Sequence, residues 1–266
     1  MSAPPAPAFQ RLAFGHVAEL YDRIRPPYPD SAIEAVAAYA HLAPGAAVVE
    51  VGAGTGKATV ALARLGLRVL ALEPSAEMAR MLRENCARWP RVHVDQREFE
   101  LWEPSARFAA VVCANAWHWL DHGERWRRAH RALAAGGALA ALWTLPDWRR
   151  CALRDPLSEV YRRLAPRFAP EFPMHPDSSP DRLVGDWSAE AAASGLFDAA
   201  QVLELRWCQR YDADAYPLLL ATHQDHILLE KATRERLFAG IAATIAASGG
   251  ELSLPLRTLV CLAIRR

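Results

Sequence analysis

The sequence predicts an α/β protein built on a doubly wound, mostly parallel sheet. Between residues 47 and 143, short runs rich in Val, Leu and Ala alternate with segments of helical period. This alternation at short spacing is typical of βαβ units, in which a helix returns the chain to the start of the next parallel strand. The leading strand also runs into Gly52, Gly54 and Gly56, and open parallel sheets bind their ligands at the carboxyl ends of strands.

Changes of hydrophobic period give the elements in chain order. Strands are predicted at residues 47–51, 67–72, 92–94, 108–114, 138–143, 201–211 and 258–264. Helices are predicted at residues 9–20, 31–41, 57–65, 75–89, 123–133, 157–163, 189–194, 215–229 and 233–247. Local signals support several of these helices, because Asp30 or Ser31 and Ser75 suit N-cap positions, and Gly66 and Gly136 follow helix ends.

We expect one domain, residues 1–266, with four parts. Residues 1–42 are predicted to form an N-terminal helical lid, and residues 43–145 a ligand-binding core. Residues 146–186, where prolines, arginines and aromatics mix without a clear period, are predicted to be a helical insertion that caps the substrate pocket. Residues 187–266 hold the remaining strands and helices, and the last two strands are expected to pair in antiparallel fashion at one edge of the sheet.

Composition and charge disfavour several classes of protein. The 31 basic side chains nearly balance the 30 acidic ones, whereas a nucleic-acid binder usually has a basic surplus. The five cysteines form no CxxC pair and lack partners at metal-ligand spacing, which predicts buried reduced thiols and no metal. No apolar run approaches the ~20 residues that span a membrane, and the start MSAPPAPAF does not resemble a signal peptide. We therefore expect a soluble cytoplasmic protein, monomeric or homodimeric, that binds neither nucleic acid nor membrane.

The glycines and a later acid predict a nucleoside site. Gly52, Gly54 and Gly56 allow a tight turn and let a ligand approach the main chain directly. Glu73 ends the second strand 21 residues after Gly52, at the spacing where an acid can accept hydrogen bonds from both ribose hydroxyls. A plain strand-to-helix loop and a surface glutamate are the alternatives.

The spacing of the glycines separates two kinds of nucleoside. Dinucleotide sites use G-x-G-x-x-G, in which the N-terminus of the following helix faces a pyrophosphate. This chain has G-x-G-x-G preceded by Glu50, and Lys57 stands where the dinucleotide pattern would have its last glycine. A carboxylate in this loop would repel a pyrophosphate and attract a cation. The loop therefore favours a positively charged ligand.

At these residues the chain resembles the class I S-adenosylmethionine-dependent methyltransferases. EVGAGTG, at residues 50–56, is similar to their first motif, and LALEPSAEM is similar to the segment that follows it. The stretches YDRIRPPYP, FELWEP, VVCANAWHWLD and RALAAGGALA resemble further motifs of the small-molecule branch called type 11. Together the similar stretches cover about residues 14–145.

The resemblance implies a fold, a cofactor and a reaction. The fold is the Rossmann-like methyltransferase fold, and the cofactor is S-adenosyl-L-methionine. The reaction is in-line transfer of its methyl group to a small-molecule acceptor, with oxygen expected as the methylated atom and nitrogen or carbon as alternatives. Aromatic side chains in the second half of the chain hint at an apolar or planar acceptor.

The resemblance also implies roles for residues at the strand ends. Gly52, Gly54 and Gly56 would lie against the methionine part of the cofactor, with Glu50 orienting the loop or the ammonium group, while Glu73 would hold the ribose. The further cofactor-binding residues implied are Tyr21 and Arg25 in the N-terminal element, Pro74 beside the adenine, and Glu98 and Phe99 in the loop after the third strand. Of these, Arg25 could pair with the cofactor carboxylate, and Glu98 could accept from the adenine amino group.

Two residues beyond the fourth strand are candidates for the catalytic centre. Asn115 would face the methionine end of the cofactor and the transferable methyl group, with a loop-capping role as the alternative. His118, in AWHWLD, has an ordinary pKa suited to a general base, and packing beneath a helix start is the alternative. His175, His223 and His226 could also face the acceptor, or could be exposed or satisfied histidines.

Three other functions stay open from the sequence. A methyltransferase acting on tRNA or another macromolecule would carry the same motifs, although the balanced charge argues against it. The basic run RWRRAHR, at residues 125–131, is better explained as the solvated face of a helix with Trp126 and Ala129 turned inward. A protein that binds the cofactor without transferring methyl would keep the same glycines and Glu73. An NAD-dependent dehydrogenase is the third rival, and the glycine spacing disfavours it.

Overall fold

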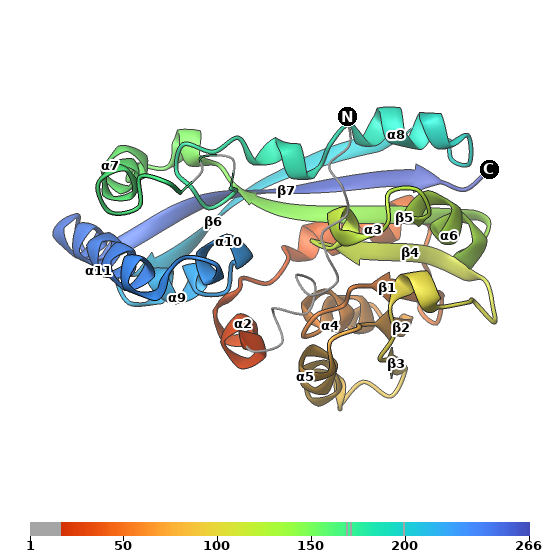
Figure 1. Cartoon of the computed structure of the whole chain (residues 1–266). Coiled ribbons are helices and arrows are strands. Elements are labelled where there is room, and N and C mark those ends of the chain that lie inside the picture. The colour runs from red at the N-terminus through yellow and green to blue at the C-terminus, as the bar shows by residue number, and fades with distance from the viewer. Residues whose placement is uncertain (1–16, 169, 171, 199) are drawn as a thin grey trace.

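The computed structural model describes residues 17–168, 170, 172–198 and 200–266, and a sheet of seven strands forms its centre (Figure 1). The strands are β1 (Ala47–Val51), β2 (Arg68–Leu72), β3 (Val92–Asp95), β4 (Phe108–Ala114), β5 (Leu133–Pro146), β6 (Gln201–Asp212) and β7 (Glu251–Ile264). They lie in the order β3-β2-β1-β4-β5-β7-β6. Strands β1 to β5 are parallel to one another, and β7 runs antiparallel to both β5 and β6. The predicted mostly parallel sheet with an antiparallel pair at one edge is confirmed.

Helices cover both faces of this sheet. They are α2 (Ala18–Ile24), α3 (Asp30–Tyr39), α4 (Lys57–Arg64), α5 (Ala76–Cys86), α6 (Arg125–Ala132), α7 (Arg154–Leu164), α8 (Trp187–Ser194), α9 (Ala215–Leu220), α10 (Gln224–Ile227) and α11 (Lys231–Ala247). On one face α3, α4 and α5 share a core with Val48 and Val112, and on the other face α6 and α8 share a core with Val49 and Val111. Because successive residues of a strand point to opposite faces, continuous apolar strands bury both sides of the sheet.

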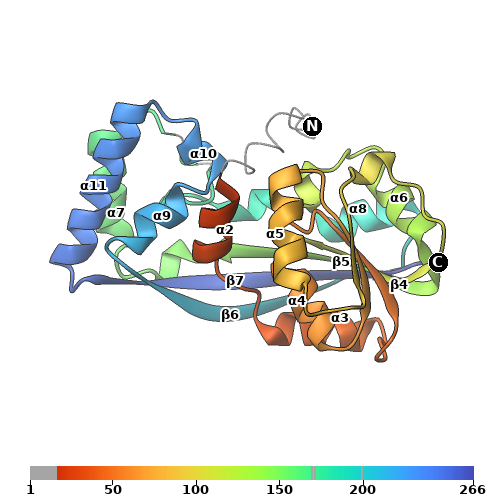
Figure 2. The same cartoon turned by 90° about the horizontal axis from the view of Figure 1, so that it is seen from below.

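A third core lies toward the other end of the long strands. Helices α7, α9 and α11 pack there against Leu252, Leu254 and Leu256 of β7. Figures 1 and 2 show these helices and α10 at one end of the molecule and α4 to α6 at the other, bridged by β5, β6 and β7. We call residues 147–168, 172–183 and 213–247 the cap. Helix α2 lies between the two ends and contacts both α5 and α9.

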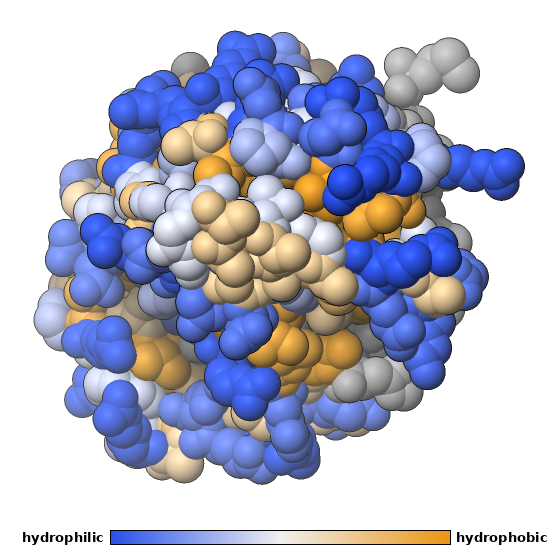
Figure 3. Space-filling view, turned by 90° about the vertical axis from the view of Figure 1, so that its left-hand side faces the viewer, coloured by the Kyte–Doolittle hydropathy of each residue, from blue (hydrophilic) through white to orange (hydrophobic). Residues whose placement is uncertain are grey.

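The outer face of the cap is of mixed polarity. Figure 3 views the molecule from the side that carries α7 and α11, and hydrophilic side chains there surround separate patches of hydrophobic ones. On α11, the exposed residues of the last turns include Ala243, Ala246 and Ala247. Within the described part of the chain, every helix is too short or too polar to cross a membrane.

The N-terminal elements differ from their predicted bounds. Helix α2 continues to Ile24, past the predicted end at residue 20, and Arg25 is extended, as favoured for a residue that precedes a proline. The predicted start of this helix, from residue 9, lies outside the described residues. Helix α3 begins at Asp30 with Pro29 at its N-cap, so neither Asp30 nor Ser31 provides the predicted side-chain cap.

The helix predicted at residues 215–229 is two short helices, α9 and α10. The chain leaves the helical path at Thr222, whose hydroxyl donates to the carbonyl oxygen of Leu219 at 2.7 Å. A side-chain bond of this kind competes with the helical main-chain pattern. The break brings His223 to the wall of the ligand cavities described below.

The last strand is longer than predicted. It begins at Glu251, not at residue 258, and passes through Pro255. A proline suggests a loop because it offers no main-chain donor. The last residue pair between β5 and β7 joins Pro146 to Leu256. Pro255 lies just outside this pairing, so β5 does not need a main-chain N–H from it.

Two side chains lie differently from their predicted places. Cys208, on the edge strand β6, is exposed, whereas the other four cysteines are buried as predicted. Arg125 belongs to the basic run, yet it is only 4% exposed. Its guanidinium donates to the carbonyl oxygen of Trp117 at 3.0 Å and pairs with Glu190 at 2.5 Å, and these bonds compensate for its removal from water.

Candidate functional site

A cavity of about 670 Å³ lies at the carboxyl ends of β1, β4 and β5, and we call it the main cavity. The strand order reverses between β1 and β4, which is the place where open α/β sheets bind ligands. Its lining runs from Glu73, after β2, past the glycine loop (residues 52–56) to Leu228 and Leu229 of the cap. A second cavity of about 70 Å³, the small cavity, shares Gly54 and Asn115 with it.

Each of the three positions in the loop requires glycine for a different structural reason. All have positive φ, but a Cβ on Gly52 would lie 2.6 Å from the Cβ of Ala116, and one on Gly56 would lie 2.5 Å from Leu82. A Cβ on Gly54 would meet nothing within 4 Å. Gly52 and Gly54 line both cavities, whereas Gly56 lines neither. Gly54 is therefore the position where bare main chain faces open space, and Gly56 is explained by packing on α5.

Glu73 and the glycine loop form one hydrogen-bonded unit. The N–H of Gly54 donates to Oε2 of Glu73 at 2.8 Å, and the N–H of Ser75 donates to Oε1 at 2.9 Å. The carboxylate is 7% exposed, and its burial raises its pKa, an effect that the two main-chain bonds oppose. Each oxygen can accept another hydrogen bond. Glu73 thus reaches the main cavity as a fixed double acceptor, the geometry that two neighbouring hydroxyls require.

The residues expected around the adenine also line the main cavity. Pro74, Glu98 and Phe99 all contribute to its wall, although the Phe99 ring is only 3% exposed and stacks on Trp102. Three apolar neighbours in the same wall were not predicted from the sequence, and they are Met78, Trp119 and Leu120. Their signal was present, because Met78 closes LALEPSAEM and Trp119 and Leu120 lie in AWHWLD.

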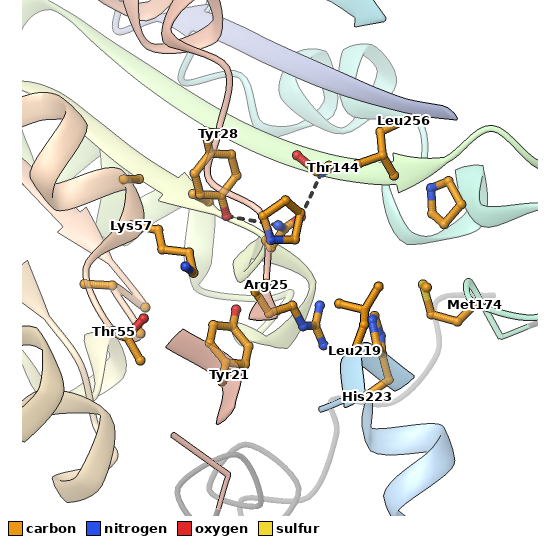
Figure 4. Close-up of a pocket in the computed structure, with 18 of the residues that line it drawn as sticks. Tyr21, Arg25, Tyr28, Thr55, Lys57, Thr144, Met174, Leu219, His223 and Leu256 are labelled. Carbon is orange, nitrogen blue, oxygen red and sulfur yellow. Dashed lines mark hydrogen bonds between the residues drawn. The ribbon is translucent and has the colours of Figure 1, made fainter. Parts of the chain in front are cut away.

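The small cavity gathers charged groups of both signs beside the glycine loop. Figure 4 shows two of them, Lys57 and Arg25. Glu50 is 1% exposed, accepts from the hydroxyl of Thr59 at 2.5 Å, and has its pKa raised to about 8 by burial. The ammonium group of Lys57 donates to the carbonyl oxygen of Asp22 at 2.7 Å, and burial lowers its pKa. Lys57 was noted in the sequence only as a departure from the dinucleotide pattern, and its place in this cavity was missed.

Arg25 joins the N-terminal lid to the cap. Its Nε donates to the hydroxyl of Thr222 at 2.8 Å, and its Nη2 donates to the Thr222 carbonyl oxygen at 2.9 Å. Its guanidinium also lies over the ring of Tyr21, 4.9 Å from the ring centre. Figure 4 shows Arg25 and Tyr21 pointing into the same space as Lys57, with His223 of the cap beside Arg25. Both predicted lid residues therefore lie at the cavities.

Asn115 is held by the protein on both sides of its carboxamide. Its Nδ2 donates to the hydroxyl of Tyr28 at 2.9 Å, and its Oδ1 accepts from the N–H of Thr144 at 2.9 Å, the two dashed lines in Figure 4. Its φ of 53° lies in the left-handed region that asparagine tolerates better than most residues. Asn115 lines both cavities, and its amide ties the lid to β5. Tyr28, missed as a site residue, lies in the RPPYP element.

His118 lines the main cavity, with one of its nitrogens already bonded. The indole Nε1–H of Trp143 donates to Nδ1 at 3.1 Å. Burial lowers the pKa of the imidazole to about 4, and the charge of Arg125 contributes to the same shift. A group of such low basicity is a poor general base at neutral pH. The geometry therefore does not favour the predicted base role.

The cap side of the main cavity is mainly apolar. Its apolar lining includes Trp143, Leu145, Phe168, Phe172, Met174, Leu183, Leu228 and Leu229. Among the three histidines of the second half, His223 lines both cavities. His226 is fully buried, between the hydroxyl of Tyr161 at 2.7 Å and Asp225 at 2.8 Å, and His175 is 4% exposed. Asp225 itself lines the cavity, held in place by His226.

Known proteins resemble this chain both in sequence and in fold. Residues 48–137 match the family model described as a methyltransferase domain. An uncharacterized methyltransferase of Mycobacterium tuberculosis is 36% identical over 154 residues, which cover 57% of this chain and 60% of that protein. The chain thus aligns with less than two thirds of the length of this relative.

Two solved structures share the fold over almost the whole chain. A candidate type II methyltransferase from Anaeromyxobacter dehalogenans has a TM-score of 0.62 at 24% identity, covering 91% of this chain and 97% of that one. A methyltransferase from Geobacter sulfurreducens, solved in complex with S-adenosyl-L-homocysteine, has a TM-score of 0.52 at 14% identity and full coverage of both chains. At such identities the likeness concerns the fold.

Proposed function

We propose that this chain, which matches the methyltransferase-domain family model over residues 48–137, transfers a methyl group from S-adenosylmethionine to a small molecule that enters under the cap. The observation that carries the proposal is the continuity of the main cavity. One space joins the double acceptor Glu73, the bare main chain at Gly54 and an apolar chamber beside Trp143. A transferase needs such a space, because donor and acceptor must meet inside it.

The chemistry of the small cavity suits the amino-acid part of S-adenosylmethionine. That part carries a carboxylate and an ammonium group, and the small cavity holds Lys57 and Arg25 as cations and Glu50 as an acid. The buried carboxyl of Glu50 has a pKa of about 8. A cation bound beside it would lower that pKa and favour the carboxylate, since an opposite charge stabilises the ionised form.

The nucleoside part fits the opposite wall of the main cavity. The free acceptor capacity of Glu73 matches ribose hydroxyls, and Met78, Trp119 and Leu120 offer apolar surface to a base. Gly54 leaves room for the atoms between ribose and amino acid, because a Cβ there would point into open space. The Geobacter sulfurreducens protein of the same fold holds S-adenosyl-L-homocysteine, which is consistent with this assignment.

The contribution of the protein is mainly positioning. Bound S-adenosylmethionine supplies a methyl group on a positively charged sulfur, and this chemistry needs little covalent help. Holding two reacting groups in a near-attack arrangement can lower a barrier by about 7–11 kcal/mol in the best intramolecular cases. The lid is tied to the cap by Arg25 and, through Asn115, to β5 by Tyr28, and it would keep the acceptor aligned and water out.

A small acceptor fits the cap better than a macromolecule does. The apolar chamber lies between β5 and the cap, with the buried Phe168 and Met174 and the exposed Phe172 and Leu228 in its wall. The charge of the whole chain is balanced, with 31 basic against 30 acidic side chains. We expect methylation at oxygen, with nitrogen and carbon as the alternatives to be distinguished by product analysis.

Transfer of labelled methyl tests the proposal directly. The protein is incubated with S-adenosylmethionine labelled at the methyl group and with a panel of apolar phenols, carboxylic acids and amines. Label in an organic-soluble product, absent when Gly54→Val replaces the parent, would support transfer. Tight binding of the cofactor without label in any acceptor would favour a cofactor-binding protein. Calorimetry that shows binding of NADH but not of S-adenosyl-L-homocysteine would contradict the proposal.

A further inference from the structure

We propose that His118 is the residue that binds the acceptor molecule by donating a hydrogen bond, and that the acceptor is an apolar compound with a carbonyl or carboxylate oxygen. The proposal starts from a contact in the wall of the apolar chamber, where the imidazole of His118 is hydrogen-bonded to the indole of Trp143. The inference rests on the proposed function, because it assigns the acceptor to that chamber.

Trp143 decides which nitrogen of His118 carries the proton. The indole Nε1 lies 3.1 Å from Nδ1 of the imidazole. An indole N–H can only donate, so Nδ1 must offer its lone pair and the neutral ring must carry its proton on Nε2. Trp143 is 1% exposed, and its ring packs edge-on against Trp187, with ring centres 6.1 Å apart. The donor is thus fixed in the core and holds His118 in one tautomer.

The same contact prevents His118 from acting as a base. A proton taken from an acceptor would have to go to Nδ1, since Nε2 already carries one. Protonated Nδ1 would face the indole N–H, and two donors would then point at each other. The positive side chain of Arg125 and the neighbouring His122 also disfavour an imidazolium. His118 therefore stays a neutral donor through the physiological pH range.

The remaining donor of His118 is available to a ligand. No residue of the described part of the chain pairs with Nε2. Nε2 is also not one of the fully buried side-chain polar atoms that lack a hydrogen-bond partner. The wall of the main cavity on the cap side is mostly apolar, with Leu145, Phe168 and Leu183 among its residues, and its polar members include His223 and Asp225. A donor on a mostly apolar wall selects an oxygen that accepts a hydrogen bond on an otherwise apolar molecule.

The tautomer is measured without any substrate. Protein labelled with nitrogen-15 in histidine is studied by long-range proton–nitrogen correlation from pH 5 to pH 8, and the His118 signals are assigned by their loss in His118→Gln. The expected pattern is one bare and one protonated nitrogen, with the proton on Nε2 throughout. A proton on Nδ1, or a doubly protonated ring at pH 6, would overturn the proposal.

Binding of two matched probes tests whether an oxygen that accepts a hydrogen bond increases affinity. 2-Acetylnaphthalene and 2-ethylnaphthalene have the same apolar body, but only the ketone can accept a hydrogen bond. Their affinities are compared by calorimetry on protein saturated with S-adenosyl-L-homocysteine. The parent and His118→Gln, which keeps an N–H donor, should bind the ketone about tenfold more tightly. His118→Leu, of similar size without a donor, should bind both probes equally.

The outcomes separate this inference from the proposed function. Affinity for S-adenosyl-L-homocysteine should stay within threefold in both variants, because His118 is assigned to the acceptor. Equal affinity of the parent for the two probes, or failure to bind either, contradicts the inference while leaving cofactor binding intact. Loss of S-adenosyl-L-homocysteine binding in the parent itself would instead contradict the proposed function.

Discussion

The two ends of the main cavity are built from different parts of the chain. The end near β1 and β2 consists largely of main chain and of Glu73, held by the N–H groups of Gly54 and Ser75. The cap end consists of side chains from β5, from residues 167–168 and 172–174, and from the segment around α10. The comparison teaches that a site made of main chain places strict demands on local sequence, whereas an apolar chamber accepts many side-chain combinations.

Filling the space at Gly54 should have the largest effect. Gly54→Val places side-chain atoms where a Cβ now meets nothing within 4 Å, so we expect a loss of S-adenosyl-L-homocysteine affinity of at least about 100-fold. Calorimetry measures the affinity. Gly45→Val is the matched control, because its φ is also positive and its Cβ also meets nothing, yet Gly45 lines neither cavity. Equal affinities of the two variants would contradict the placing of the ligand at Gly54.

Glu50 should make stability depend on pH. In the folded state its pKa is about 8, above the ordinary 4.5. Between these two pH values the folded state therefore keeps a proton that the unfolded state has released. Stability should therefore fall as pH rises from 5 to 9, by on the order of 3 kcal/mol, and Glu50→Gln should remove most of this slope. Chemical denaturation at pH 5, 7 and 9 measures it. Glu84→Gln, at an exposed site of α5, is the matched control.

Glu73 should matter more for binding than for folding. Glu73→Gln removes the charge but keeps one acceptor oxygen, and we expect cofactor binding to weaken by about 1–3 kcal/mol, the range of a hydrogen bond to a charged group. Calorimetry with S-adenosyl-L-homocysteine measures this loss. Adenine alone should bind the parent and the variant equally, since Glu73 is assigned to the ribose. Unchanged affinity for S-adenosyl-L-homocysteine would show that Glu73 does not bind this ligand.

The bond between lid and sheet should have the smallest effect. Tyr28→Phe removes the hydroxyl that accepts from Asn115, and we expect unfolding to become easier by about 1 kcal/mol. Urea denaturation measures the change. Tyr39→Phe, in α3, lacks this bond to Asn115 and serves as the control. A loss at Tyr28 no larger than at Tyr39 would show that this contact does not hold the lid.

Much of the fold could be predicted from the sequence, because its elements carry local signals. The strand at Phe108–Ala114 was predicted at its observed bounds, since an unbroken apolar run marks a strand buried on both faces. Ser75 was recognised as an N-cap, and its hydroxyl accepts from the N–H of Met78. The break of the 215–229 helix was missed, because it depends on Thr222, which bonds Arg25 from 197 residues away in the chain.

The site could be predicted best at the end near β1 and β2. Gly54 and Glu73 follow a spacing that main-chain geometry imposes, so they were found and do line the cavity. Tyr28 was missed because its role comes from a contact with Asn115, 87 residues later. The tautomer of His118 depends on Trp143, which reaches it from the neighbouring strand. Contacts between distant segments leave no periodic pattern in the sequence.

A crystal structure with S-adenosyl-L-homocysteine bound tests the central claim most directly. The ribose hydroxyls should donate to both carboxylate oxygens of Glu73, and the sulfur should lie beside the main chain of Gly54, facing the chamber of Trp143. A sulfur turned away from that chamber, or a main cavity left empty in crystals grown with excess ligand, would contradict the claim that donor and acceptor meet in this one space.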